Sequence, residues 1–424
     1  MRVVRVLAVG AALAATVSLA TPAQGAVSTV TAEATGSTAQ QTAKRLKNPI
    51  VAHRGSPRVA PEETLAAYRA AIAEGAAVLE GDVQLTREGE LVLVHDDTLD
   101  TTTDAEQIFP DRGPWRVGDF TLAEIKQLDA GSWVHEKFAA ERVPTLEEVL
   151  VLARGKTGFN LEMKSPQSSP GVATKLAALL AECGYTDDRV NPRTGMLEIA
   201  VHSRDEAVLR EFAALLPHVR ISWLSGGPML DDSRLAELAT WTDAVYATPT
   251  ATTAADIDRA HEVGLKVYSD PVDSPKSIAM ARNQRYDYLV TNVPAVAKRV
   301  VAGKDPRLGL DGVEIEHVMA NPSGEDNQPE NGEYVALRNT TDQPIDISSH
   351  TLTDHAANIW LSTGDKAVIQ PGGLFLVYVN TGTNRADAYY NGYSVGMFNN
   401  TGGDTVYLMD ENMNLEDVYS YVLP

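Results

Sequence analysis

The sequence predicts an α/β barrel of eight parallel strands, a TIM barrel, followed by an all-β domain. Between residues 48 and 303, short apolar runs alternate with helix-like segments, a pattern typical of a parallel α/β fold. Eight of these runs fall within about 250 residues, as a TIM barrel requires. From residue 311 to 424 the runs are short, alternating and separated by Asn, Gly and Pro, which predicts a domain built from strands.

The first 47 residues precede both domains and read as an export segment. Arg2 and Arg5 are followed by the apolar run 6–20 and by the small residues of 22–26, the order of a secretory signal peptide. We therefore expect a signal peptide over residues 1–26, a disordered Ser/Thr/Ala-rich linker over 27–47, and a secreted protein. No run is long enough for a membrane-spanning helix, so no transmembrane segment is expected.

The strands and helices of the barrel are predicted in order along the chain. An additional run, 91–94, is placed in a long excursion after the second strand. Capping-box spacings at Thr121 to Glu124 and Thr145 to Glu148 predict helix starts. The segment 171–183 is helix-like and ends on Cys183, the only cysteine, which excludes a disulfide within the chain. The eight predicted strands are 50–53, 78–82, 158–164, 197–202, 219–224, 244–248, 265–269 and 288–291.

The net charge of −21 becomes −23 once the signal peptide is removed. A surface this acidic repels nucleic acid at long range and leaves metal cations free to approach. No nucleic-acid partner is therefore expected.

Histidines and carboxylates gather where the predicted strands end. His53 and His95 end two runs, and Glu80, Asp82 and Glu162 end two others. Residues two apart on a strand point to the same face, and the carboxyl ends of barrel strands line the active site. Three converging carboxylates need a cation, and oxygen ligands suit Ca²⁺ or Mg²⁺.

The same rim also carries two basic residues, Arg54 and Lys164. Together with a cation they would form an electropositive pocket that suits a phosphate, with the histidines as acid and base. Each residue alone also has a purely structural explanation. A carboxylate can cap a turn, and a histidine at a strand end can simply be hydrogen-bonded to its neighbours. The co-occurrence of all of them favours function.

At these residues the sequence resembles the glycerophosphodiester phosphodiesterase family. The resemblance covers about residues 48–300. It rests on seven motifs, which are Ala52-His-Arg-Gly55, Pro61-Glu62, Thr64-Leu-Ala-Ala-Tyr68, Glu80-Gly-Asp-Val-Gln-Leu-Thr86, Leu91-Val-Leu-Val-His-Asp96, Val143-Pro-Thr-Leu-Glu-Glu-Val149 and Leu161-Glu-Met-Lys164. It implies a TIM barrel that hydrolyses glycerophosphodiesters to glycerol 3-phosphate and an alcohol.

The resemblance also implies a role for each rim residue. One divalent cation, Ca²⁺ or Mg²⁺, would be bound by Glu80, Asp82 and Glu162, and would lower the pKa of a glycerol hydroxyl. His53 and His95 would be acid and base, in an order left open, and water would then open a cyclic phosphate. The groups that would position the phosphate or glycerol are Arg54, Glu62 and Lys164.

Four positions or stretches depart from the family pattern. Glu63 stands where Asn is usual, and Gly81 stands where an apolar residue separates the paired ligands. The usual Trp-Thr-Val-Asn stretch is replaced by 268–273, which ends on Asp273, and the closing Thr-Asp-x-Pro has Asn292 in place of Asp. The predicted ligands and histidines are retained, so catalysis is expected while substrate preference stays open.

Residues 311–424 resemble a lamin-tail domain, which implies an immunoglobulin-like sandwich. The resemblance rests on the segments 331–339, 345–348, 352–354, 369–372 and 399–408. This part holds 17 Asp and Glu against 3 Lys and Arg, which argues against binding nucleic acid. A solubilising accessory with no specific ligand and an adhesion or calcium-linked role, with contact to the cell surface or wall, are equally open.

Two alternatives to the main prediction remain. The first is an enzyme of the phospholipase D type acting on lysolipids or sphingolipids, which the lack of a basic membrane-docking face disfavours. The second is a non-catalytic barrel that binds phosphodiesters or a wall polymer. The loss of a predicted metal ligand would have favoured it, and all three are retained.

Overall fold

The computed structural model describes residues 48–424, except 309–311, 327, 355–359, 400–402 and 422–424. The predicted signal peptide and linker, residues 1–47, lie outside the described residues. Among the helices that are described, none has both the length and the apolar character needed to cross a bilayer.

The first domain is a parallel barrel whose eight strands are the eight predicted from the sequence. They are hydrogen-bonded in the order β8, β7, β6, β5, β4, β2, β1, β9, and a parallel bridge between Tyr268 and Tyr288 joins β8 to β9. The predicted run at 91–94 forms β3 (Leu91–Leu93), antiparallel to β2. The barrel strands are β1 Ile50–Ala52, β2 Val78–Leu85, β4 Gly158–Met163, β5 Ile199–Ser203, β6 Arg220–Trp223, β7 Ala244–Ala247, β8 Lys266–Ser269 and β9 Leu289–Thr291.

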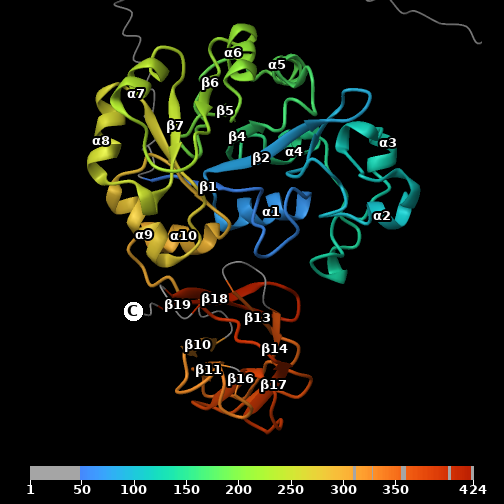
Figure 1. Cartoon of the computed structure of the whole chain (residues 1–424), viewed down its shortest axis with the longest axis vertical. Coiled ribbons are helices and arrows are strands. Elements are labelled where there is room, and N and C mark those ends of the chain that lie inside the picture. The colour runs from blue at the N-terminus through green and yellow to red at the C-terminus, as the bar shows by residue number, and fades with distance from the viewer. Residues whose placement is uncertain (1–47, 309–311, 327, 355–359, 400–402, 422–424) are drawn as a thin grey trace, which may run out of the picture. The chain divides into compact units, whose positions relative to one another are not determined.

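Helices surround these strands on the outside (Figure 1). Both predicted capping boxes are present, with Thr121 and Thr145 accepting from the backbone of the glutamates three residues later. The short helices α2 (Ala105–Ile108) and α3 (Leu122–Ile125) lie in the long excursion between β3 and α4. The surrounding helices are α1 Leu65–Glu74, α4 Leu146–Ala153, α5 Val172–Glu182, α6 Glu206–Leu215, α7 Asp232–Leu238, α8 Ala254–Glu262, α9 Pro275–Gln284 and α10 Pro294–Val301.

The barrel interior is filled by side chains, with aromatic rings on one side. The rings of Tyr246, Tyr268 and Tyr288 stack in succession, with centroids 4.9 and 4.1 Å apart, and the ring of His202 stacks on Tyr246 at 5.2 Å. The three buried tyrosines thus form part of the barrel core, and their stacked rings support the ring of His202 near the end of β5.

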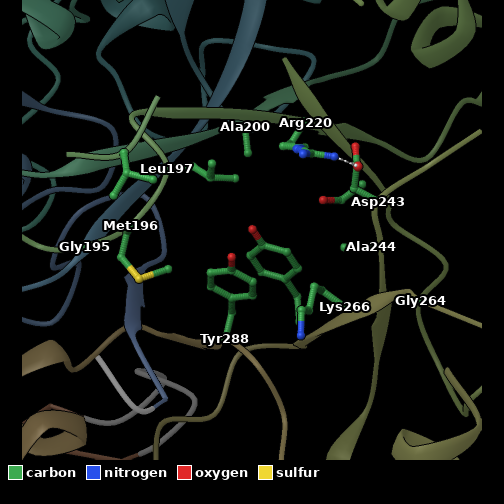
Figure 2. Close-up of a pocket in the computed structure, with 13 residues that line it drawn as sticks. Gly195, Met196, Leu197, Ala200, Arg220, Asp243, Ala244, Gly264, Lys266 and Tyr288 are labelled. Atoms are coloured by element: carbon green, nitrogen blue, oxygen red, sulfur yellow. Dashed lines mark hydrogen bonds and ion pairs between the residues drawn. The ribbon is translucent and has the colours of Figure 1, made fainter. Parts of the chain in front are cut away.

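A cavity of about 370 Å³ opens at the amino ends of β5 to β8 (Figure 2). Leu197 and Ala244 line it together with Tyr288, and an ion pair between Arg220 and Asp243 (2.6 Å) borders it. Because TIM barrels place their active sites at the opposite, carboxyl ends of the strands, this cavity belongs to the framework of the barrel.

In the second domain, the described residues form two four-stranded sheets and one pair of short strands. The sheet orders are β10-β11-β16-β17 and β14-β13-β18-β19, and β12 pairs with β15. Apolar side chains from both sheets, including Val335, Leu352 and Val406, share one buried core, as in a β-sandwich. The strands are β10 Val313–Met319, β11 Tyr334–Asn339, β12 Ile345–Asp346, β13 Thr351–Thr353, β14 Trp360–Ser362, β15 Val368–Ile369, β16 Leu374–Asn380, β17 Ala388–Tyr393, β18 Asp404–Met409 and β19 Leu415–Tyr421.

The described residues from 48 onward belong to one compact unit, and the side chain of Tyr407 in β18 connects the two domains within it. Its hydroxyl donates to the carbonyl oxygen of Asp273 at 2.9 Å, and Arg58 lies over its ring. Met409 and Leu415 belong to the same apolar cluster as Val293 of the barrel. The sandwich therefore packs on the barrel through apolar contacts.

Candidate active site

Strand register brings three ionisable side chains to one level at the carboxyl end of the barrel. Asp82 in β2 is the register partner of Glu162 in β4, and Glu162 is the partner of His202 in β5. Neighbouring parallel strands in register direct partner side chains to the same face. Glu80, two residues before Asp82, points to that face as well, as the sequence predicts.

A buried group of side chains that could hold a metal ion consists of Glu80, Glu162 and His202. One ligand atom from each lies within 4.8 Å of the others. Two atoms bound to the same ion at about 2.4 Å each lie no more than about 4.8 Å apart. The spacing therefore fits a shared ion.

Asp82, the third predicted ligand, lies beside this group and faces two basic side chains. Its carboxylate is 3.3 Å from Nε of Arg54 and 3.4 Å from Nζ of Lys164. Within the described residues, neither of its buried oxygens accepts a hydrogen bond. Although burial acts in the opposite direction, Lys164 and Arg54 lower the pKa of Asp82 to about 2. It is therefore ionised at neutral pH and open to a further positive partner.

The other two carboxylates are protonated more readily because they are buried near Asp82. Burial, followed by the charge of Asp82, raises the pKa of Glu80 well above its usual value and that of Glu162 to about 7. Burial also lowers the pKa of His202 to about 3, so its imidazole is neutral at pH 7. A bound cation would favour both ionised glutamates, so the donor set fits a divalent ion.

His53 is oriented by a chain of two hydrogen bonds. Its Nδ1 atom lies 2.8 Å from Oδ1 of Asn292, and Nδ2 of Asn292 donates to Asp273 at 2.6 Å. Because the Asp273 carboxylate accepts from Nδ2, the amide oxygen must face the histidine, and Nδ1 of His53 must carry the proton. Burial, followed by the charge of Arg54, lowers the pKa of His53 to about 4. Its Nε2 atom is therefore free to accept a proton.

His95 lies on the loop after β3 and is paired with a carboxylate. Its Nδ1 atom is 2.7 Å from Oδ1 of Asp96, and the charge of His95 contributes to the low pKa of Asp82. Nε2 of Gln84, a buried residue of β2, donates to the carbonyl oxygens of Val94 and Asp96 at 2.8 and 2.7 Å. The loop that presents His95 is thus fixed to the strand that carries Glu80 and Asp82.

Arg54 connects several parts of the site. Its backbone nitrogen donates to Glu80 at 2.9 Å, and its guanidinium donates to Glu62 at 3.1 Å. The residue has a positive φ of 54°, a conformation that non-glycine residues adopt at a cost of order 1 kcal/mol. The structure thus places the predicted substrate-binding residues Arg54 and Lys164 against Asp82, and Glu62 against Arg54.

A cavity of about 600 Å³ lies beside His53 and Arg54. It contains Trp133, whose side chain is 49% exposed, and two residues of the sandwich, Thr353 and Met413. This cavity gives a ligand bound near His53 room to extend. Its walls are His53, Arg54, Pro57, Arg58, Glu62, Trp133, Val134, Asn292, Thr353 and Met413.

The sequence prediction did not include His202, Asn292 or Asp273 among the site residues. His202 ends a predicted strand, which is the same signal that identified His53. Asn292 and Asp273 were noted only as departures from a family pattern, and their contact across 19 positions of the chain required the fold.

Both domains are similar to known proteins. Residues 53–296 match the glycerophosphoryl diester phosphodiesterase family, and residues 310–422 match the Lamin Tail Domain. The chain is 39% identical over 181 residues to a glycerophosphodiester phosphodiesterase of Caldanaerobacter subterraneus subsp. tengcongensis, covering 42% of this chain and 67% of that protein. It is 30% identical over 247 residues to YhdW of Bacillus subtilis, covering 58% of this chain and 94% of that protein.

Among solved structures, a phosphodiesterase of Oleispira antarctica in complex with the product sn-glycerol-3-phosphate is similar with a TM-score of 0.50. It is 26% identical, and the match covers 60% of this chain and 96% of that one. The chain therefore belongs to the glycerophosphoryl diester phosphodiesterase family of phosphoric diester hydrolases and carries a C-terminal lamin tail domain.

Proposed function

We propose that this protein is a secreted enzyme that hydrolyses glycerophosphodiesters to glycerol 3-phosphate and an alcohol with the help of one divalent cation. The observation that supports this hydrolysis most is the orientation of His53, whose Nδ1 atom is held by Asn292, so that Nε2 is the atom left to act as a base. A base with this orientation, an anionic ligand group and two basic side chains meet at the carboxyl end of the barrel.

The phosphate would be bound by Arg54 and Lys164. Both carry charges that complement a phosphodiester, and Arg54 is held in place by Glu62 and Asp82. When bound, the cation would polarise the phosphoryl oxygens and favour ionisation of a glycerol hydroxyl. Glu80, Asp82 and Glu162 would hold it, as predicted, with His202 as a further candidate ligand.

The proton transfers follow from the two histidines. Nε2 of His53 takes the proton of a glycerol hydroxyl, whose oxygen attacks phosphorus and forms a cyclic phosphate. His95, protonated and paired with Asp96, donates its proton to the departing alcohol oxygen. In the second step His95 takes a proton from water, which opens the ring, and protonated His53 returns its proton to the glycerol oxygen.

The identity of the cation is a separate part of the proposal. The sequence prediction of Ca²⁺ or Mg²⁺ rests on oxygen ligands, whereas imidazole also suits Zn²⁺. Three carboxylates still outnumber the single histidine, so we retain Ca²⁺ or Mg²⁺. Stripping the protein with a chelator and restoring Ca²⁺, Mg²⁺ or Zn²⁺ separately, with metal content measured each time, tests this choice.

A substrate panel tests the reaction. We expect glycerol 3-phosphate to be released from glycerophosphocholine and related diesters. Cleavage of lysolipids alone would instead support the phospholipase D alternative, and binding without turnover would support the non-catalytic barrel.

Two further expectations concern location and partners. Export is proposed from residues 1–26, and full-length protein found only inside its cells of origin would contradict it. Contact with the cell surface or wall is proposed for the acidic residues 311–424. Sedimentation of the protein with isolated cell walls, with and without a divalent cation, tests that contact.

A further inference from the structure

Glu63 is a buried carboxylate close to the site that takes no part in the proposed proton transfers. It lies in the turn before α1, is 5% exposed, and has a positive φ of 59°. Its backbone nitrogen donates to the carbonyl oxygen of Arg54 at 3.1 Å. The turn that carries Arg54 and the turn that carries Glu63 are therefore linked.

The side chain of Glu63 connects α1 to β2. Its Oε1 atom accepts from the backbone nitrogen of Asp82 at 2.9 Å, and its Oε2 atom accepts from the hydroxyl of Tyr68, which is 1% exposed. Both carboxylate oxygens thus have one buried donor each.

Strand pairing explains why Asp82 needs such a partner. On one side of β2, the described pairs with β1 end at Leu79, and the described pairs with β3 begin at Val83. Residues 80–82 lie between them, so the Asp82 nitrogen has no strand acceptor there. The carboxylate of Glu63 supplies that acceptor at the point where β2 presents its two acidic side chains.

Gly81 is part of the same arrangement. A Cβ atom at this position would lie 2.5 Å from the hydroxyl oxygen of Tyr68 and 3.3 Å from Oε2 of Glu63. Because real Cβ atoms do not approach so closely, any larger residue would displace the hydroxyl that holds Glu63. The departures at 63 and 81 are therefore parts of one matched set with Tyr68.

We propose that Glu63 is a positioning residue that fixes the backbone of β2 at Asp82 and so directs the carboxylates of Glu80 and Asp82 toward the cation. The inference rests on the proposed function, because it assumes that a cation is bound there. An acceptor oxygen is all that the Asp82 nitrogen requires, so glutamate and glutamine serve equally. Partners that orient metal ligands affect metal affinity by about 10- to 100-fold.

The test is calorimetric titration of the chelator-stripped full chain with Ca²⁺ and with Mg²⁺. We expect Glu63→Ala to weaken binding by at least about tenfold and Glu63→Gln to stay within about threefold of the wild type. Glu74→Ala, which removes the partly buried glutamate at the carboxyl end of α1, is the control and should leave the affinity unchanged. Thermal melts identify variants that do not fold.

If Glu63→Ala does not fold, Tyr68→Phe takes its place, since it removes only the hydroxyl that holds Oε2. It should weaken cation binding by about threefold or more. Binding equal to wild type by a folded Glu63→Ala or Tyr68→Phe variant would overturn the positioning role alone. No cation binding by the wild type would overturn both this role and the cation of the proposed function.

A double variant tests the matched set independently of any cation. Gly81→Ala should lower the melting temperature, because its methyl group meets the Tyr68 hydroxyl. Adding Tyr68→Phe should recover part of that loss. If the decreases in melting temperature caused by Gly81→Ala and Tyr68→Phe simply add in the double variant, the Tyr68 hydroxyl is not the reason that position 81 requires glycine. The arrangement as proposed is then wrong.

Discussion

Asn292 holds Nδ1 of His53 at 2.8 Å, and its own amide is fixed by the carboxylate of Asp273. Two departures from the family pattern thus meet at the histidine that we propose as the base. The family pattern has Asp at the position of Asn292 and Asn at the end of the stretch that here ends on Asp273, so the two residue types are interchanged. The amide oxygen of Asn292 faces Nδ1 of His53, and its Nδ2 group donates to the carboxylate of Asp273. The neutral amide also adds no charge that would raise the pKa of His53.

Replacing Asn292 by Asp should change the pH dependence of the reaction. A second carboxylate would favour protonated His53, whose pKa is now lowered to about 4 by burial. Because a base must be neutral to act, we expect the acidic limb of kcat/KM to move to higher pH. An unchanged limb in Asn292→Asp would show that His53 is not the base. Asn292→Leu, which keeps the volume without a charge, is the control.

Replacing a side chain of the buried group Glu80, Glu162 and His202 should weaken metal binding. We expect Glu162→Gln and His202→Gln each to reduce cation affinity by at least about tenfold, because each removes a ligand atom or its orientation. Metal titration of stripped protein measures this. A His202→Gln variant with wild-type affinity would show that the histidine only fills space beside Tyr246.

Glu74 should make the stability of the barrel depend on pH. Burial raises its pKa to about 7, although Ser56 donates to it at 3.0 Å. Between the unfolded value of about 4.5 and pH 7 the folded state binds more protons, so its stability falls as the pH rises through this window. Glu74→Gln should be more stable than wild type by about 1–2 kcal/mol at pH 8, and equal to it near pH 4.

Urea unfolding at the two pH values checks the effect of Glu74→Gln. The prediction concerns the difference between variant and wild type, so that other titrating groups cancel. A difference that does not change with pH would mean that Glu74 is not the titrating group.

Tyr246→Phe should destabilise the barrel interior. The Tyr246 hydroxyl lies 2.7 Å from Nδ2 of Asn160, which is 0% exposed. Its removal leaves a buried amide without that partner, at a cost of about 1–3 kcal/mol. The free energy of unfolding in urea measures the change, and a loss below about 0.5 kcal/mol would show that Asn160 finds another partner.

The barrel could be predicted because its strands are short apolar runs bounded by polar residues. All eight were found within one or two residues of their ends, except that β2 continues past Asp82 to Leu85. That extension pairs with β3 as a hairpin, which needs the excursion to fold back. A local pattern does not contain this information.

The site was predictable where residues act through their place on a strand. Glu80, Asp82 and Glu162 follow from parity and strand ends, and the structure brings them together. The orientation of His53 by Asn292 and Asp273 could not be predicted in this way. These three residues follow β1, β9 and β8, which are distant in sequence and become neighbours only in the folded barrel. The role of Glu63 depends on where the pairing of β2 is interrupted, which only the three-dimensional fold shows.

The most direct test is release of glycerol 3-phosphate from glycerophosphocholine by protein lacking residues 1–26, with wild type and His53→Ala compared at saturating cation. The account predicts turnover by the wild type, a loss of kcat of about 10²- to 10⁴-fold in His53→Ala, and unchanged cation affinity in that variant. Wild-type protein that binds the cation but releases no glycerol 3-phosphate from any glycerophosphodiester would contradict it, as would a His53→Ala variant of undiminished kcat.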